Sequence, residues 1–314
     1  MKAKILKVLA PLLIAISVVL PAMAEDADRT YTDPTNVDTD YAVQGEYSGT
    51  IDGQKIGVQV IALGDGMFDL VSYPGGLPGD GWNRMDKTTA TGSTKGGGSV
   101  FADYLSGKEG NLSRVVRKSS TLGMQPPEGA VVLFDGTSTD AFTEAEMTED
   151  KLLKTGVSSK QLFANHRIHL EFRTPYKPFA RGQARGNAGL YVQGRYETQI
   201  LDSFGLEGEM DEAGGIYSIK APDFNACFPP LSWQTYDVEF TAAEFENGEK
   251  VKSARMTVRL NGFVIQDDVE LTHATTASPL EEGPEEGPVY LQDHGNPVVY
   301  RNIWVLKLIT KTET

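Results

Sequence analysis

The chain has 314 residues and a formal net charge of −14, with 43 acidic and 29 basic side chains. This balance opposes nucleic acid and anionic membranes as partners and favours a neutral or cationic ligand. A single cysteine excludes a disulfide framework, so the fold must depend on its hydrophobic core. The 33 glycines and 16 prolines, with few long helical patterns, favour an all-β protein, which we expect to form two domains.

Residues 1–24 have the features of a secretory signal peptide. Three lysines precede the apolar run LAPLLIAISVVLP, and small residues follow at positions 22–24. The run is too short for a membrane span, and no later segment has a comparable one, so we expect an exported mature protein with no membrane association, periplasmic or extracellular. Loss of the three lysines would change the formal charge from −14 to −17.

The remaining chain divides by composition. Residues 25–44 are acidic and turn-rich, which predicts a flexible leader. Residues 45–120 contain short strands between Asp-Gly turn signals and predict a small β accessory module. Residues 121–130 have the proline and glycine content of a linker, and residues 131–309 form the longer second domain. A turn or two of helix is expected around residues 143–153.

Strands of the second domain show a clear alternation. In residues 167–173 (RIHLEFR), the apolar side chains at 168, 170 and 172 share one face and the polar side chains share the other. Residues 235–240 and 254–262 repeat this pattern, the latter before an Asn-Gly turn. Such strands predict two antiparallel sheets packed face to face, as in a jelly-roll β-sandwich with solvated outer faces.

The segment RYETQILDS, residues 195–203, places polar groups in a strand that otherwise reads as buried. Period-two alternation puts Glu197 and Gln199 on one face, where they could line a ligand groove. Asp202 has the opposite parity and joins them only if a bulge or the strand end rotates it. The alternative for both carboxylates is a structural hydrogen-bond network inside the sandwich.

Seven motifs of the second domain occur in a characteristic order: LFDGTSTDAF, EFRTP, NAGLYVQGRYETQILDSFG, GGIYSIKAP, SWQTYDVEF, LNGFVIQDD and VYLQDHGNPVVYRNIWVLKL. Together they resemble the 3-keto-disaccharide hydrolase domain family, a secreted bacterial family with a concanavalin-like or laminin G-like sandwich. The resemblance covers about residues 130–309. Asn187-Ala188-Gly189 stands where the family commonly has Asn-Ser-Gly, so the serine is lost while the glycine is kept.

The resemblance implies a substrate whose sugar ring carries a ketone at carbon 3, made by a separate sugar 3-oxidoreductase. The ketone acidifies the hydrogen on carbon 2, and the glycosidic oxygen on carbon 1 can then leave by elimination. Addition of water completes net hydrolysis. Such a site needs a general base, donors facing the enolate oxygen and an acid for the departing oxygen.

Three residues are candidates for catalysis. His294, in LQDHGNP, is the first candidate for proton transfer, chiefly through the resemblance, because an unperturbed imidazole titrates near neutrality; the alternative is a histidine that only fixes the following turn. Glu197 could act as base, and Asp202 could assist it. The same three side chains could hold a divalent cation that stabilises an enediolate, although no spacing motif specifies a metal.

Aromatic rings and polar groups suited to a sugar lie in the same motifs. Trp233 and Trp304 are expected to pack and not to bind a sugar, Cys227 is expected to be buried, and Arg301 could pair with Glu197 or Asp202. The candidates for substrate binding are Gln199, Asn187, Tyr191, Tyr217, Gln292 and Arg301.

Two other functions fit the same residues. A concanavalin-like sandwich could bind glycans without catalysis, as a lectin does. An ordinary glycosidase would use Glu197 and Asp202 as a carboxylate pair on an unoxidised substrate.

Overall fold

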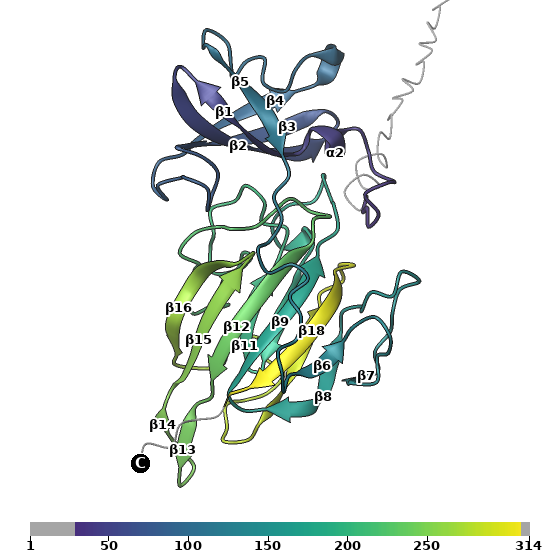
Figure 1. Cartoon of the computed structure of the whole chain (residues 1–314), viewed down its shortest axis with the longest axis vertical. Helices are drawn as coiled ribbons and strands as arrows, with labels where there is room; N and C mark the ends of the chain where they lie inside the picture. Colours follow the sequence, from purple (N-terminus) through teal and green to yellow (C-terminus); the bar gives the residue numbers. More distant parts are fainter. Residues whose placement is uncertain (1–28, 309–314) are drawn as a thin grey trace, which may run out of the picture.

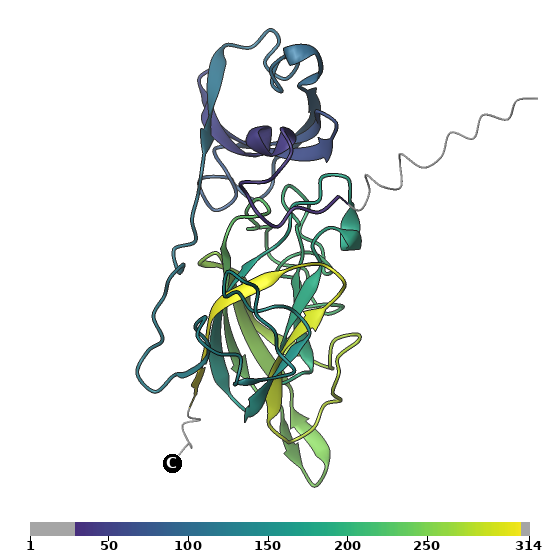
Figure 2. The same cartoon turned by 90° about the vertical axis from the view of Figure 1, so that its right-hand side faces the viewer.

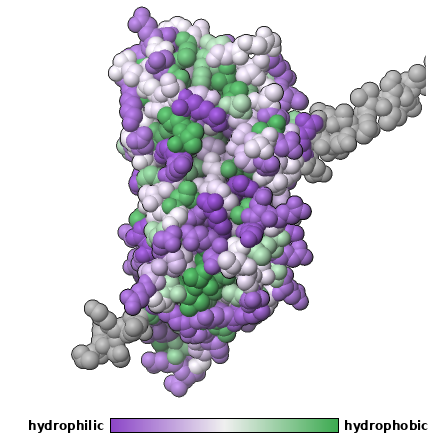
Figure 3. All heavy atoms as spheres, turned by 45° about the vertical axis from the view of Figure 1, so that its right-hand side comes forward, coloured by the Kyte–Doolittle hydropathy of each residue, from purple (hydrophilic) through white to green (hydrophobic). Residues whose placement is uncertain are grey.

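The computed structural model describes residues 29–308 and has two lobes (Figure 1). The expected signal peptide, residues 1–24, lies outside the described residues. A five-stranded sheet forms the smaller lobe, and a second five-stranded sheet and a six-stranded sheet form the sandwich. Figure 3 shows that atoms of the two lobes make a continuous surface on the viewed face. The prediction of an all-β sandwich is confirmed.

The smaller lobe, called the β-module below, is an antiparallel sheet with strand order β4-β3-β2-β1-β5. The Asp-Gly pairs at 52–53 and 65–66 have positive φ angles at both residues, the geometry of tight hairpin turns. Alternate apolar side chains of β2 and β3 share one face of the sheet and are buried in one hydrophobic cluster. The strands are β1 (Gly45–Ile51), β2 (Gln54–Gly64), β3 (Met67–Pro74), β4 (Thr88–Ser93) and β5 (Gly110–Val115).

The sandwich packs a five-stranded sheet, order β11-β10-β17-β8-β7, against a six-stranded sheet, order β16-β15-β12-β9-β18-β6. A continuous cluster of buried apolar side chains fills the space between them. The first sheet contains β7 (Phe142–Thr143), β8 (Val157–Phe163), β10 (Ala188–Val192), β11 (Tyr196–Ile200) and β17 (Gly287–Asp293). The second contains β6 (Val131–Phe134), β9 (His166–Arg173), β12 (Gln234–Thr241), β15 (Ala254–Leu260), β16 (Phe263–Leu271) and β18 (Val299–Lys307).

Smaller elements complete the described chain. They are α2 (Asp40–Val43), the hairpin β13 (Glu244–Glu246) and β14 (Glu249–Lys252), and two 3₁₀ turns, η1 (Lys95–Gly97) and η2 (Gly182–Ala184). None of the described helices is long and apolar enough to cross a membrane. The helical turn expected around residues 143–153 is wrong, because Met147 and Leu153 form a β-bridge there and Lys151 has a φ of 60°.

The flexible leader expected at residues 25–44 is also wrong over its described part. Tyr31 pairs with Tyr176 through backbone hydrogen bonds, and their rings stack at 5.5 Å. Tyr41 lies against the same ring at 5.2 Å. The leader carries few apolar side chains, but Tyr31, Tyr41 and two valines among them pack against the cluster that contains Tyr176 at the junction of the two lobes.

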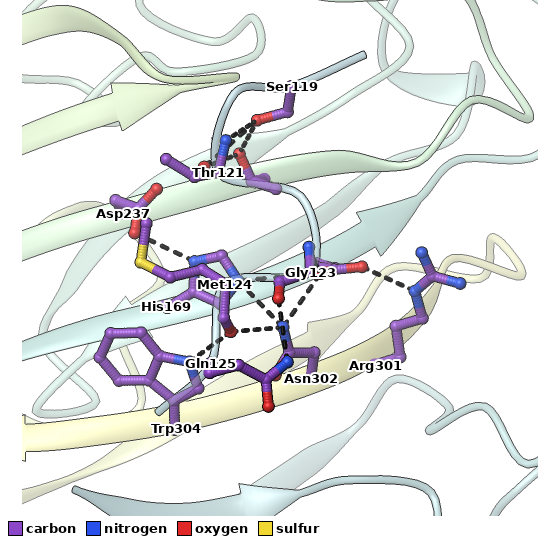
Figure 4. Close-up of polar contacts among 12 residues, drawn as sticks. Ser119, Thr121, Gly123, Met124, Gln125, His169, Asp237, Arg301, Asn302 and Trp304 are labelled. Carbon is purple, nitrogen blue, oxygen red and sulfur yellow. Dashed lines mark hydrogen bonds and ion pairs between the residues drawn. The ribbon is translucent and has the colours of Figure 1, made fainter. Parts of the chain in front are cut away.

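The linker crosses the outer face of the six-stranded sheet, as Figure 2 shows. It covers His169 and Glu171, so the polar face of β9 that we expected to be solvated is buried. Glu171 accepts hydrogen bonds from the backbone N–H of Gly123 at 2.6 Å and from Asn302 at 3.0 Å. Figure 4 shows Gly123 and Met124 of the linker close to His169 and Asn302 of the sheet. Polar side chains on this face therefore fix the linker to the sandwich.

Candidate functional site

Polar side chains gather on the outer face of β10, β11 and β17. The strand register places Tyr191 opposite Glu197, and Gly189 opposite both Gln199 and Gln292. The intervening residues of these strands enter the core. The alternation predicted for residues 195–200 is confirmed, since it aims the polar set away from the core.

These side chains line a small pocket of about 90 Å³, called the Glu197 pocket below. A larger hollow of about 690 Å³, between residues 32–35 and 148–155, contains none of the predicted site residues. The pocket unites six of the predicted residues with three that sequence reasoning missed, Gln183, Thr276 and Ala277. Its lining is Gln183, Asn187, Glu197, Gln199, Tyr217, Thr276, Ala277, Gln292 and His294.

Glu197 is the buried acid of the pocket, with 3% of its surface exposed. Burial raises the pKa of its carboxyl to about 7, and a 2.7 Å hydrogen bond from the Tyr191 hydroxyl to Oε2 acts in the opposite direction. Gly189 makes room for this carboxyl, because a Cβ at that position would overlap Oε1 of Glu197. The glycine kept from the family motif therefore has a steric reason.

Amide side chains form the wall beside Glu197. Gln199 donates to Oδ1 of Asn187 at 2.9 Å and to Oε1 of Gln183 at 3.2 Å. Asn187 donates to the same Gln183 oxygen at 2.7 Å. The three amides hold one another in fixed orientations. Gln183 belongs to η2, four residues before Asn187, and no periodic pattern in that loop could have identified it.

Gln292 has an unused acceptor. Its Nε2 donates to the Tyr191 hydroxyl at 3.3 Å, whereas Oε1 is buried without a hydrogen-bond partner among the described residues. A buried acceptor left unpaired costs free energy. A hydroxyl group of a ligand in the pocket would satisfy it.

His294 and Tyr217 lie at the more open side of the pocket. His294 is exposed and stands in a tight turn, where Asn296 donates to its carbonyl oxygen at 3.2 Å. Tyr217 is half-buried, and its backbone N–H donates to the carbonyl of Glu197 at 3.2 Å. The pocket thus combines a buried carboxyl, an imidazole and a phenol.

Asp202 does not line this pocket. It lies beyond the end of β11, fully buried, with Oδ2 accepting from Nε of Arg185 at 2.7 Å. Burial raises the pKa of Asp202, and the Arg185 charge opposes that change. The structure therefore brings Glu197 and Asp202 to different surroundings and does not form the carboxylate pair of an ordinary glycosidase.

Arg301 also lies elsewhere, and its expected pairing with Glu197 or Asp202 is wrong. It is on β18 of the opposite sheet, where Nε donates to Oε2 of Glu171 at 2.7 Å. Its guanidinium lies 3.9 Å from the centroid of the Trp233 ring. Residue patterns do not indicate which sheet β18 joins, so the partner of Arg301 could not be identified.

The structure does not assemble the metal ligand set of Glu197, Asp202 and His294. Asp202 already pairs with Arg185, and the described residues contain no group of three His, Cys, Asp or Glu side chains that could hold a metal ion. Cys227, as expected, is buried, and burial raises the pKa of its thiol to about 12.

The arrangement can transfer protons to and from a hydroxylated ligand. A carboxyl that titrates near neutrality can accept a proton, and the imidazole at the rim can donate one. The amides and Gln292 Oε1 offer directional hydrogen bonds of the kind that sugar hydroxyls require.

Comparison with known proteins now identifies the family. The profile of the 3-keto-alpha-glucoside-1,2-lyase-like domain matches residues 129–306. The chain belongs to this family. The expected resemblance is confirmed, and the match includes β6 to β17 and all but the last residue of β18, while the β-module lies outside it.

Solved structures are also similar to the chain. A candidate glycosyl hydrolase from Parabacteroides distasonis ATCC 8503 is 30% identical with a TM-score of 0.53, covering 58% of this chain and 85% of that one. A second from the same organism is 18% identical with a TM-score of 0.43, covering 62% of this chain and 99% of that one. No curated protein matches the chain.

Proposed function

We propose that the protein is an exported enzyme that cleaves the glycosidic bond of 3-keto-glycosides by elimination and rehydration. Family membership supports a role in glycoside cleavage. The observation that carries the chemistry is Glu197, a buried carboxyl whose pKa is raised to about 7 inside a pocket of sugar-binding character.

Glu197 is the proposed base. An ordinary glutamate is fully ionised at neutral pH and is a weak base, whereas a carboxyl with a pKa near 7 accepts a proton more readily. The 3-ketone makes the hydrogen on carbon 2 acidic. Glu197 removes this proton, and the electron pair of the C2–H bond moves into an enolate between carbons 2 and 3.

The enolate oxygen needs hydrogen-bond donors, because negative charge develops on it. Tyr217 and the Asn187 amide line the pocket and are the proposed donors, while Gln292 Oε1 accepts from a sugar hydroxyl.

His294 is the proposed acid for the leaving group. The enolate reforms the ketone, a double bond forms between carbons 1 and 2, and the bond between carbon 1 and the glycosidic oxygen breaks. The departing oxygen receives a proton from the His294 imidazole. Water then adds with its hydroxyl on carbon 1 and its hydrogen on carbon 2, which gives the 3-keto sugar and the free alcohol.

The substrate must come from a separate oxidation of a sugar at carbon 3, since the proposed steps neither gain nor lose electrons overall. A sugar 3-oxidoreductase is therefore the expected functional partner. The signal-like residues 1–24 support action in the periplasm or outside the cell.

A glycan-binding module without catalysis is the leading alternative. Binding alone requires aromatic rings and hydrogen-bond donors and has no need of a carboxyl with a pKa near neutrality beside an imidazole. The shared pocket of Glu197 and His294 therefore favours the enzyme.

The test compares purified protein on a 3-keto-glucoside and on its unoxidised parent. We expect release of the aglycone from the keto substrate alone. Binding of both compounds without release would support the lectin, and release from the parent would support an ordinary glycosidase. Export is tested separately by locating the full-length chain in cell fractions, where retention in the cytoplasm would contradict it.

A further inference from the structure

The β-module contacts the segment that forms one wall of the Glu197 pocket. This segment, residues 177–187, contributes Gln183 and Asn187 to the pocket lining. Apart from the 3₁₀ turn η2 it has no regular structure, so its conformation depends on contacts made by its side chains. Several of those contacts are with the β-module, which lies outside the family match.

The first contacts are at the end of β2. The Arg181 guanidinium donates to the carbonyl oxygen of Leu63 at 3.2 Å. The ring of Phe179 packs against Gly64 so closely that a Cβ at residue 64 would overlap it. Gly64 also has a φ of 89°, a conformation that favours glycine.

Arg185 makes the deepest connection. Its guanidinium reaches Asp202 in the sandwich, and it also lies 3.4 Å from the carbonyl oxygen of Ala62 and 3.5 Å from Oε1 of Gln44. Gln44 Oε1 in turn accepts from the backbone N–H of Ala62 at 3.0 Å. Arg185 is 5% exposed, so these polar groups form one buried network across the lobes.

The network continues into the pocket through the backbone. Asp202 donates its N–H to the carbonyl oxygen of Arg185 at 3.0 Å, which ties the segment to the end of β11. Asn187, two residues further on, accepts from Gln199, which shares a face with Glu197.

We propose that the β-module is a structural part of the active site and that Arg185 is a positioning residue, which holds the Gln183 and Asn187 wall against the module. Only the kinetic consequence of this proposal rests on the function proposed above. It gives the β-module, which the sequence predicted only as an accessory module, a structural role beside the Glu197 pocket.

The test uses Arg185→Lys in the full-length protein. Lysine keeps a positive charge beside Asp202, but it lacks the planar fork with which arginine reaches three partners. The matched control is Arg84→Lys, because Arg84 also crosses between the lobes, with its guanidinium 4.1 Å from the Phe224 ring centroid and no partner in residues 177–187.

Hydrogen exchange of residues 181–187 without ligand is the first measurement. We expect Arg185→Lys to accelerate exchange in this segment by about tenfold, with β1 to β5 and the Arg84→Lys control unchanged. Unchanged exchange in Arg185→Lys, or equal acceleration in both variants, would overturn the proposal. If Arg185→Lys does not fold, Arg181→Met is measured with the same expectation; it removes the contact with Leu63 together with the hydrogen bonds from Arg181 to the carbonyl oxygens of Pro178 and Ala180.

Kinetics on the 3-keto-glucoside is the second measurement. A loosened wall should raise KM by about tenfold with kcat within about twofold of wild type, and the pH dependence set by Glu197 should not move. A fall in kcat with an altered pH profile would contradict a positioning role. Because hydrogen exchange needs no substrate, it tests whether Arg185 holds residues 181–187 against the β-module even if the wild-type protein cleaves no 3-keto-glycoside.

Discussion

The Tyr191 hydroxyl donates a 2.7 Å hydrogen bond to Oε2 of Glu197 from the directly opposite position on the neighbouring strand. Burial and this hydrogen bond act on the carboxyl in opposite directions, and burial has the larger effect, so the pKa rises to about 7. The folded protein therefore holds a carboxyl that is partly protonated at neutral pH.

The raised pKa of Glu197 has a cost in stability. Between the ordinary glutamate value of 4.5 and about 7 the folded state binds more protons than the unfolded state, so stability falls as pH rises through this window. Glu197→Gln should remove that loss, because glutamine can still accept from Tyr191. The free energy of unfolding should exceed that of wild type by about 3 kcal/mol at pH 8 and by about zero at pH 4.

Denaturant titrations at the two pH values check this, with Glu286→Gln as a control at an exposed glutamate. A Glu197→Gln variant that is less stable than wild type at pH 8 would show that the carboxylate is stabilised in the folded state.

Tyr191→Phe tests the hydrogen bond itself. The bond favours the ionised carboxyl, so its loss should raise the pKa of Glu197 further. The acid limb of the pH dependence of kcat/KM should move to higher pH. Tyr290→Phe is the control, since its ring lies 5.5 Å from that of Tyr191 without a hydrogen bond to Glu197. A limb that stays in place would mean that another group controls it.

Period-two alternation was sufficient to place Glu197 and Gln199 on one face of their strand. Gln292 was a candidate for another reason, because an amide suited to a sugar lies in one of the motifs. Gln183 and Thr276 lie on loops, where no period exists and position depends on long-range contacts. The ion pairs of Asp202 with Arg185 and of Arg301 with Glu171 could not be predicted, because the sequence does not show which elements become neighbours in space.

The positions of the described leader and of the linker could not be predicted from the sequence for the same reason. Their composition is that of mobile segments, and composition does not reveal a docking surface on another element. Tyr176 and Glu171 provide such surfaces, and both residues belong to the sandwich.

Gly189→Ala tests the steric requirement beneath the carboxyl. Gly189 lies in a strand with an ordinary φ, so alanine is compatible with the backbone, but its Cβ would displace Oε1 of Glu197. We expect kcat/KM to fall by about tenfold or more while the circular dichroism spectrum is unchanged. Gly98→Ala is the control, because a Cβ there meets nothing within 4 Å. Wild-type turnover in Gly189→Ala would contradict the assigned position of the base.

Glu171→Gln tests how the linker is held. Burial alone would raise the pKa of Glu171, but the His169 imidazole 3.9 Å from Oε1 and hydrogen bonds from Asn302, Gly123 and Arg301 together lower it to about 2. Its contribution to stability is therefore complete above about pH 4.5 and is lost as pH falls towards 2. The variant should lose about 2 kcal/mol at pH 7 and approach wild type near pH 2.

Urea unfolding at both pH values measures this difference, and hydrogen exchange of residues 119–125 reports on the linker. Equal stability of Glu171→Gln and wild type at pH 7 would mean that the linker does not depend on this carboxylate.

The most direct test of the central claim is NMR of the reaction on a 3-keto-glucoside in heavy water, with wild type, Glu197→Gln and a sample without enzyme. Elimination and rehydration predict that wild type releases the aglycone and a 3-keto sugar with deuterium on carbon 2, faster than the spontaneous exchange seen without enzyme. Glu197→Gln should slow release by at least about a hundredfold. Release of the aglycone with the original hydrogen retained on carbon 2 would contradict the account.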